Sequence, residues 1–144
     1  MNRIAALAVA LSLTAFTAGA ARAADLTVTV QDVDNTKGSV VAAFYDSEAS
    51  FLKPPLAKAL LKTKAVEGAV SFVVHDLPAG KYAVTTFHDE NDSGKLATNS
   101  LGVPTEGYGF SNDAQGAGGP PKFAQAAFDF DGQAAKTIVI HLND

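Results

Sequence analysis

Residues 72–84, FVVHDLPAGKYAV, carry the strongest fold signal in the chain. Apolar positions such as Phe72 and Val74 alternate with other residues before the turn, which is the period of a half-buried strand. The Pro-Ala-Gly sequence that follows favours a tight turn. A second alternating run then extends from Tyr82 to His88. The stretch therefore predicts two strands connected by a short turn.

Similar strand signals lie on both sides of this stretch. Alternation and β-branched residues predict strands at 26–30, 39–45, 66–76, 127–130 and 136–142. A turn at 34–38 separates the first two of these, so we expect them to form a hairpin. Gly68 either bends the third strand or divides it into a strand pair.

Helix signals are few and short. A helix is predicted at 55–62 because Leu56, Ala59 and Leu60 have helical spacing, and 123–128 is expected to be a short helix or irregular. Many short strands with little helix predict a single domain, residues 24–144. Its expected fold is an all-β antiparallel Greek-key β-sandwich with one or two short helices.

The first 23 residues have the pattern of an export signal. Arg3 precedes a short apolar run, and Ala21-Arg22-Ala23 matches the small-x-small pattern of a cleavage site. Cleavage is expected after Ala23, with cleavage after Ala20 as the alternative. A membrane-anchoring helix is the other interpretation, but the apolar run is short for a span of ~20 residues. We therefore expect an exported protein, periplasmic or secreted, with no transmembrane segment after signal cleavage.

The charge balance and the absence of cysteine exclude several classes of function. Without residues 1–23 the chain keeps nine basic and fifteen acidic residues, a net charge of −6. Nucleic acids and anionic membranes bind basic surfaces, so neither is expected as a partner. An acidic exported protein is compatible with cation binding. The absence of cysteine excludes disulfides, thiolate metal sites and cysteine nucleophiles.

The 72–84 stretch resembles the hairpin of transthyretin-like and carboxypeptidase-regulatory-like sandwiches. In those proteins an aromatic strand leads through Leu-Pro-x-Gly-x-Tyr into the next strand. The resemblance implies a prealbumin-like fold and says little about function.

A second resemblance covers nearly all of the chain after residue 23. Its motifs are HDENDSGKLA at 88–97, LGVPTEGYGFS at 101–111 and PPKF at 120–123. They are similar to motifs of a bacterial family of small exported proteins known only as a domain of unknown function. Asn and Asp are usual in that family where this chain has Ser93 and Ala97. The resemblance implies the sandwich fold and export, and it implies no activity.

Oxygen-bearing side chains recur at every second residue of the first motif. This spacing is typical of the first half of an EF-hand calcium loop, with a backbone carbonyl as its last ligand. The usual bidentate glutamate of the second half is missing, so Glu106 or Asn99 would have to complete the shell. The candidate metal ligands are Asp89, Asn91, Ser93, Lys95 and Glu106. The other interpretation is a turn whose Asp and Asn side chains cap their own backbone.

His88 permits a catalytic interpretation, in which it acts with Asp89 and Glu106 around a metal-bound water. Strand parity instead places it on an inward face, where a structural histidine bonded to a backbone carbonyl is expected. A zinc site would need His75, His88 and His141 to converge, and their parity does not require that.

Residues 107–119 are rich in glycine and carry Tyr108 and Phe110. These aromatics form either an exposed contact for a partner or a plug for the open end of the sandwich. Ser111 lacks the second glycine of a nucleophile elbow. The candidate ligand or partner surface is His88, Tyr108, Phe110 and Ser111.

Together these features predict a non-catalytic binding or interaction module of the cell envelope. The loop 88–111 is its expected functional surface, ordered by calcium, and its partner is an envelope protein or a small ligand. One alternative is a metal-dependent enzyme that uses His88, Asp89 and Glu106. The other is a purely structural envelope protein whose loop holds nothing. The oligomeric state stays open, since the edge strands of a sandwich could pair.

Overall fold

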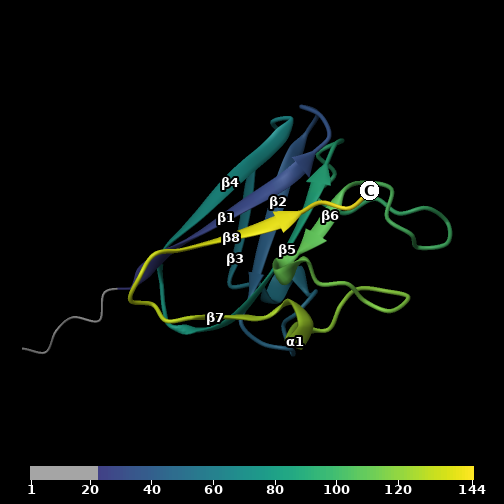
Figure 1. Ribbon diagram of the computed structural model, residues 1–144. Coiled ribbons are helices and arrows are strands. Elements are labelled where there is room, and N and C mark those ends of the chain that lie inside the picture. The colour runs from purple at the N-terminus through teal and green to yellow at the C-terminus, as the bar shows by residue number, and fades with distance from the viewer. Residues whose placement is uncertain (1–22) are drawn as a thin grey trace, which may run out of the picture.

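The computed structural model describes residues 23–144, in which strands predominate and the helices are single turns (Figure 1). The strands are β1 (Ala24–Val33), β2 (Ser39–Tyr45), β3 (Ala59–Lys64), β4 (Gly68–Leu77), β5 (Gly80–Asp89), β6 (Tyr108–Phe110), β7 (Phe128–Phe130) and β8 (Lys136–His141). The helices are the 3-10 turns η1 (Pro54–Leu56) and η2 (Ser111–Asp113) and the α-helix α1 (Phe123–Ala126). The predicted all-β class with short helices is confirmed.

The predicted signal peptide falls on residues 1–23, of which residues 1–22 lie outside the described part of the chain. Export and the cleavage site therefore stay predictions. None of the helices among the described residues is long and apolar enough to cross a bilayer.

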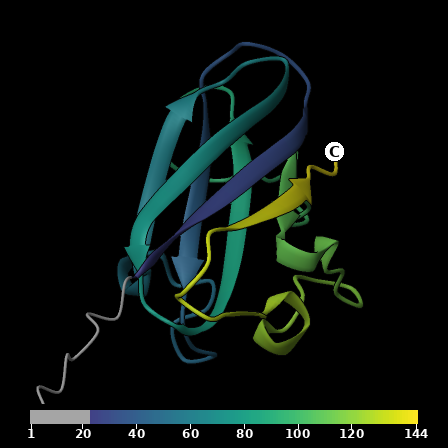
Figure 2. The ribbon, with the colours of Figure 1, turned by 60° about the vertical axis from the view of Figure 1, so that its left-hand side comes forward.

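The strands form two sheets that pack face to face. One sheet has the order β4-β1-β8, and the other has the order β3-β2-β5-β6, with β7 also paired to β5. Figure 2 shows the three-stranded sheet in front of the larger one. The paired strands are antiparallel except β1 and β8, which run parallel. The expected antiparallel sandwich thus contains one parallel pair.

The 72–84 stretch is a corner between the sheets, whereas a hairpin was expected from its resemblance. β4 pairs with β1 and β5 pairs with β2, so the chain changes sheets at the turn. The Tyr82 hydroxyl closes this turn by donating to the Pro78 carbonyl at 2.9 Å. The hairpin predicted for 26–45 is also wrong, because β1 and β2 belong to different sheets.

The helix predicted at 55–62 is wrong as well. Only Pro54–Leu56 forms a 3-10 turn, and Ala59–Lys64 is strand β3, paired along its length with β2. In β3 half-buried and exposed residues alternate, so its side chains follow the strand period. For 66–76 a single strand is observed, and because it begins at Gly68 the glycine neither bends nor divides it as predicted.

The main core lies between the sheets and a second apolar cluster lies outside them. Inward-facing residues of β1 and β2 in the main core, such as Val28 and Phe44, are fully buried. On the outer face of the larger sheet, Phe51 packs edge to face against Tyr45 and Phe123, with ring centroids 5.6 and 5.7 Å away. The outer face of a two-layer sandwich is usually polar, whereas here part of the outer face of the larger sheet carries a covered apolar cluster.

The two flanks of the sandwich differ. On one flank, Tyr108 and Asn143 exchange backbone hydrogen bonds of 3.0 and 2.7 Å, which connect β6 to the residues after β8. The backbone N–H of His141 also reaches the Asp113 carboxylate at 2.9 Å. On the opposite flank, β3 and β4 each pair with a single strand of the described chain. This flank therefore carries two unpaired strand edges.

Candidate functional site: a clamped loop beside an apolar groove

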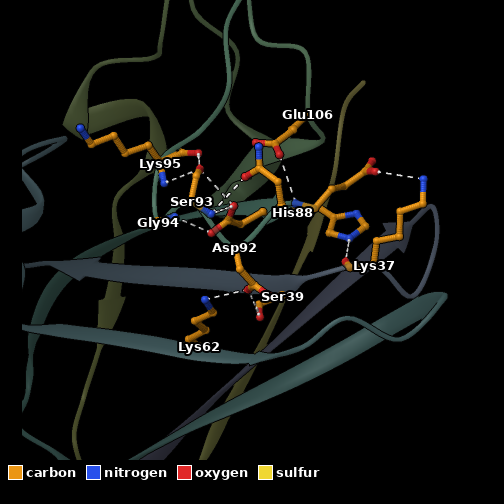
Figure 3. A network of polar contacts seen from close by, with 12 residues as sticks. Lys37, Ser39, Lys62, His88, Asp92, Ser93, Gly94, Lys95 and Glu106 are labelled. Atoms are coloured by element: carbon orange, nitrogen blue, oxygen red, sulfur yellow. Dashed lines mark hydrogen bonds and ion pairs between the residues drawn. The ribbon is translucent and has the colours of Figure 1, made fainter.

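The Asp89 carboxylate organises the first turn of the loop between β5 and β6. Asp89 is fully buried at the end of β5. Its two oxygens accept the backbone N–H groups of Ser93 and Gly94, each at 2.8 Å. Figure 3 shows Ser93, Gly94 and Glu106 within the network of polar contacts at this turn. Backbone capping by an acidic side chain is the turn geometry that the sequence left open as an alternative to calcium.

A second buried carboxylate clamps the base of the loop. Glu106 accepts the backbone N–H of Glu90 at 3.1 Å through one oxygen and that of Ala97 at 2.9 Å through the other. Its side chain therefore ties both ends of the 90–97 segment together. The sequence suggested Glu106 as a distal metal ligand and did not suggest this role.

Four of the five predicted metal ligands lie together. The Ser93 hydroxyl is 3.3 Å from Asp89 Oδ1 and donates to the Lys95 carbonyl at 3.0 Å, while Asn91 Oδ1 accepts the Ser93 N–H at 3.0 Å. Glu106 faces the backbone N–H groups described above. The described residues contain no group of three or more acidic or histidine side chains arranged to hold a metal ion. Calcium binding stays a prediction.

Asp92 attaches the tip of the same turn to the sheet. Its Oδ1 accepts the Ser39 hydroxyl at 2.6 Å and the Lys62 ammonium at 2.8 Å (Figure 3). The hydrogen bond from Lys62, followed by that from Ser39, lowers the pKa of the Asp92 carboxyl. The same Lys62–Asp92 bond raises the pKa of Lys62. Sequence reasoning missed this contact because Ser39 precedes Asp92 by 53 residues.

His88 is a buried structural histidine. Its side chain is 2% exposed, and its Nε2–H donates to the Lys37 carbonyl at 2.8 Å. Next to this contact, Gly38 has a φ of +59°, and a Cβ there would lie 2.0 Å from the Asp89 carbonyl oxygen. Only glycine lets the 34–38 turn approach the start of the loop this closely.

The other two histidines have separate contacts. His75 Nδ1 lies 3.0 Å from the Asp25 carboxylate, and His141 Nδ1 lies 2.8 Å from that of Asp113. The hydrogen bond that His141 donates to the Asp113 carboxylate raises the pKa of His141. With His88 bonded to a carbonyl, the three histidines do not share a ligand position.

An apolar groove of about 270 Å³ opens on the outer face of the larger sheet, beside the loop. Strand register explains why aromatics meet there: Phe110 lies opposite Thr85 and Tyr108 opposite Phe87, so these four side chains share one face. The groove is lined by Tyr45, Leu52, Pro54, Thr85, Thr86, Phe87, Gly94, Lys95, Leu96, Tyr108 and Phe110. The loop that Asp89 and Glu106 hold in place, residues 90–107 between β5 and β6, is called the clamped loop, and it supplies one wall through residues 94–96.

Of the four residues predicted as a ligand or partner surface, two line this groove and two are buried in the interior. The rings of Tyr108 and Phe110 meet edge to face at 6.0 Å, and both are half-buried in the groove rather than plugging an end of the sandwich. Ser111 is fully buried, where its hydroxyl accepts the Val84 N–H at 2.9 Å and donates to the Ala126 carbonyl. His88 and Ser111 thus support the site from below and do not face solvent.

Leu52 is a groove residue that the sequence did not indicate. Its backbone has a φ of +60°, a left-handed conformation that is costly for a leucine. Backbone strain of this kind is concentrated at functional sites. Its side chain is 40% exposed although it is apolar.

Two larger hollows, of about 580 and 650 Å³, lie elsewhere and share Ala135 in their linings. Charged side chains line both, and several are paired with each other, as Lys81 is with Asp129 at 2.8 Å. The groove is smaller but apolar, aromatic and adjacent to the clamped loop, so it is the stronger candidate for a binding site.

A family model described as "Uncharacterized protein conserved in bacteria (DUF2141)" matches residues 28–138. The chain belongs to this family. No curated protein and no solved structure matched the chain. The resemblance to an uncharacterised bacterial family is thereby confirmed. The family match spans the whole clamped loop and every residue that lines the groove.

Proposed function

We propose that this member of the family is an exported, non-catalytic binding module of the cell envelope. Its site is the apolar groove, and its ligand presents a compact apolar group, the size of one aromatic ring or a short alkyl chain. The groove carries this proposal because it gathers half-buried apolar and aromatic side chains in one concave place.

The clamped loop supports the proposal by giving the groove a rigid wall. Asp89 and Glu106 fix the loop from inside through backbone N–H groups, and Asp92 fixes its tip to β3 through Lys62. A wall ordered before binding loses little conformational entropy when the ligand arrives. The carboxylates that a catalytic mechanism would need are occupied in this structural role.

Calcium is proposed as a weak additional ligand of the loop, held by Asp89, Asn91, Ser93 and the Lys95 carbonyl. The close approach of their oxygens supports it. Asp89 is the one carboxylate among the four, and calcium affinity depends on the number of charged ligands. We therefore place the expected affinity in the millimolar range of extracellular modules.

The groove is tested with two small probes, indole and hexanoate, titrated into the ¹⁵N-labelled protein. Chemical-shift changes are expected to be confined to groove residues such as Phe87, Leu96 and Tyr108. Leu96→Trp, which fills the groove, should abolish them. Val139→Trp, on the outer face of the other sheet, is the matched control and should leave them unchanged. Absence of shifts with both probes, or equal shifts in the Leu96→Trp variant, contradicts the proposal.

A further inference from the structure

Strand β3 lies at the flank of the sandwich where β3 and β4 each pair with a single strand of the described chain. It pairs with β2 from Ser39↔Lys64 to Phe44↔Ala59, and within residues 23–144 no other strand pairs with it. An edge strand presents a row of N–H and C=O groups to which an extended segment can add. On the opposite flank the exchange between Tyr108 and Asn143 connects the two sheets, whereas β3 has no such connection along its outer edge in the described part of the chain.

The side chains of β3 define what an added strand would meet. Leu60, Lys62 and Lys64 are exposed, and the residues between them are half-buried. Leu61, one of the half-buried residues, packs against the main core. Because side chains alternate along a strand, an added segment would place every second side chain beside the leucine and lysines, and the others toward the core.

The edge is basic although the protein is acidic. Four of the nine lysines that follow residue 23 lie within twelve residues, at Lys53, Lys58, Lys62 and Lys64. Two of them form surface ion pairs, Lys58 with Asp46 at 3.0 Å and Lys62 with Asp92 at 2.8 Å. Each of these two charges is balanced by its carboxylate, whereas Lys53 and Lys64 form no ion pair among the described residues and leave a net positive charge at the edge.

Lysines on an edge strand also discourage pairing between identical copies. A second copy of β3 would bring its own Lys62 and Lys64 against the same charges. The occupant of this edge is therefore a different chain, and one with acidic side chains fits it best.

Exposed apolar residues around the edge indicate that the partner segment also carries apolar side chains. Leu56, Leu60 and Val66 are 55%, 59% and 54% exposed, and they lie before, on and after β3. We propose that the free edge of β3 binds an extended segment of a partner protein by strand addition, and that the segment alternates acidic with apolar side chains. This surface is separate from the groove, so it goes beyond the proposed function.

The probe is a blocked octapeptide of alternating glutamate and valine, titrated into the ¹⁵N-labelled protein. We expect chemical-shift changes concentrated on Ala59–Lys64, slower amide exchange along β3, and weaker binding at higher salt. Lys64→Glu should weaken binding by about five-fold or more, because it places like charge beside the peptide. Lys81→Glu reverses an exposed, ion-paired lysine on β5 and is the matched control, with unchanged binding expected.

Three results would overturn the proposal. The first is the absence of chemical-shift changes at β3 with about 1 mM peptide, a concentration that would detect binding with a Kd as weak as about 1 mM. The second is equal binding of a lysine–valine octapeptide, which would remove the charge argument. The third is concentration-dependent pairing of β3 without peptide, which would make a second copy the occupant. Because indole and hexanoate report on the groove alone, failure at β3 leaves the proposed function standing.

Discussion

Glu106 holds Ala97 by a hydrogen bond of 2.9 Å from the backbone N–H to the carboxylate, across nine residues of chain. The other carboxylate oxygen of Glu106 holds the N–H of Glu90. One buried side chain thereby fixes both ends of the segment that forms the wall of the groove. Two backbone N–H groups need an acceptor here. A carboxylate has two acceptor oxygens, whereas an amide has one oxygen and an NH₂ group that only donates.

Glu106→Gln should therefore loosen the loop. The new NH₂ group faces a backbone N–H and leaves it unsatisfied, so we expect the free energy of unfolding to fall by about 1–3 kcal/mol. Amide exchange at Glu90 and Ala97 should become faster, as measured by NMR. Glu67→Gln, at an exposed site, is the control and should change neither quantity. Unchanged exchange at Ala97 in the Glu106→Gln variant would show that the clamp does not order the loop.

Thr86→Val should stabilise the protein. The Thr86 hydroxyl is buried in β5 and has no hydrogen-bond partner in the described part of the chain. Valine has nearly the same shape, and it removes the cost of the buried unsatisfied group, so we expect a gain of about 1 kcal/mol in urea unfolding. Thr137→Val, on an exposed position of β8, is the control. A loss of stability in Thr86→Val would indicate that the hydroxyl has a partner, such as a buried water.

The His141–Asp113 pair should make stability depend on pH. Asp113 raises the pKa of His141, so protonated His141 is favoured in the folded state. This contribution is fully present below the unfolded pKa of about 6.5 and is lost as the pH rises through the higher folded pKa. The stability difference between wild type and Asp113→Asn should accordingly be largest below about pH 6.5 and should shrink above it. Urea unfolding across this range, with NMR titration of the His141 ring, tests this, and a difference that grows with pH contradicts it.

Leu52→Gly should raise the free energy of unfolding and weaken binding in the groove. Glycine relieves the positive φ of Leu52, and we expect a gain of about 0.5–1 kcal/mol in the free energy of unfolding. The same change removes an apolar wall of the groove, so binding of indole and hexanoate should weaken. Thermal unfolding and the NMR titration measure the two effects independently. Loss of stability in this variant would mean that the side-chain contacts outweigh the backbone strain.

Calcium removal should leave the loop intact. The hydrogen bonds from Ser93 and Gly94 to Asp89 order the turn without an ion, so EDTA should not change the Tm. Calcium at about ten times a millimolar Kd should stabilise the wild type by about 1.4 kcal/mol and Asp89→Asn not at all. A large calcium shift at micromolar concentrations would instead establish a tight site, and no shift at millimolar calcium would remove calcium from the proposal.

Local pattern predicted much of this fold. Alternation located β1, β2, β5 and β8, and the parity of His88 correctly predicted a structural histidine on a backbone carbonyl. Pairing was not predictable in the same way. The turn signals in 34–38 and 78–80 are compatible with hairpins, but the chain crosses between sheets at both, because burial of each strand depends on partners distant in sequence.

The groove was also beyond local pattern. Tyr45 on β2 and Phe110 on β6 become neighbours only through β5. At 55–62, the spacing of Leu56, Ala59 and Leu60 favours a helix. Six residues of this region instead pair with β2, and this pairing makes them a strand. The role of Glu106 likewise depends on the folded path of the loop.

The parallel pairing of β1 with β8 has a consequence for how this protein reaches its native state. Leu26 pairs with Lys136, so the central strand of the smaller sheet is completed by residues synthesised 110 positions later. The chain must lose the entropy of closing this long loop before the stabilising contacts between β1 and β8 can form. We therefore expect folding in the millisecond-to-second range of sandwich proteins. One edge of β1 therefore stays unpaired until β8 is available, and during that interval the edge is open to pairing with other strands.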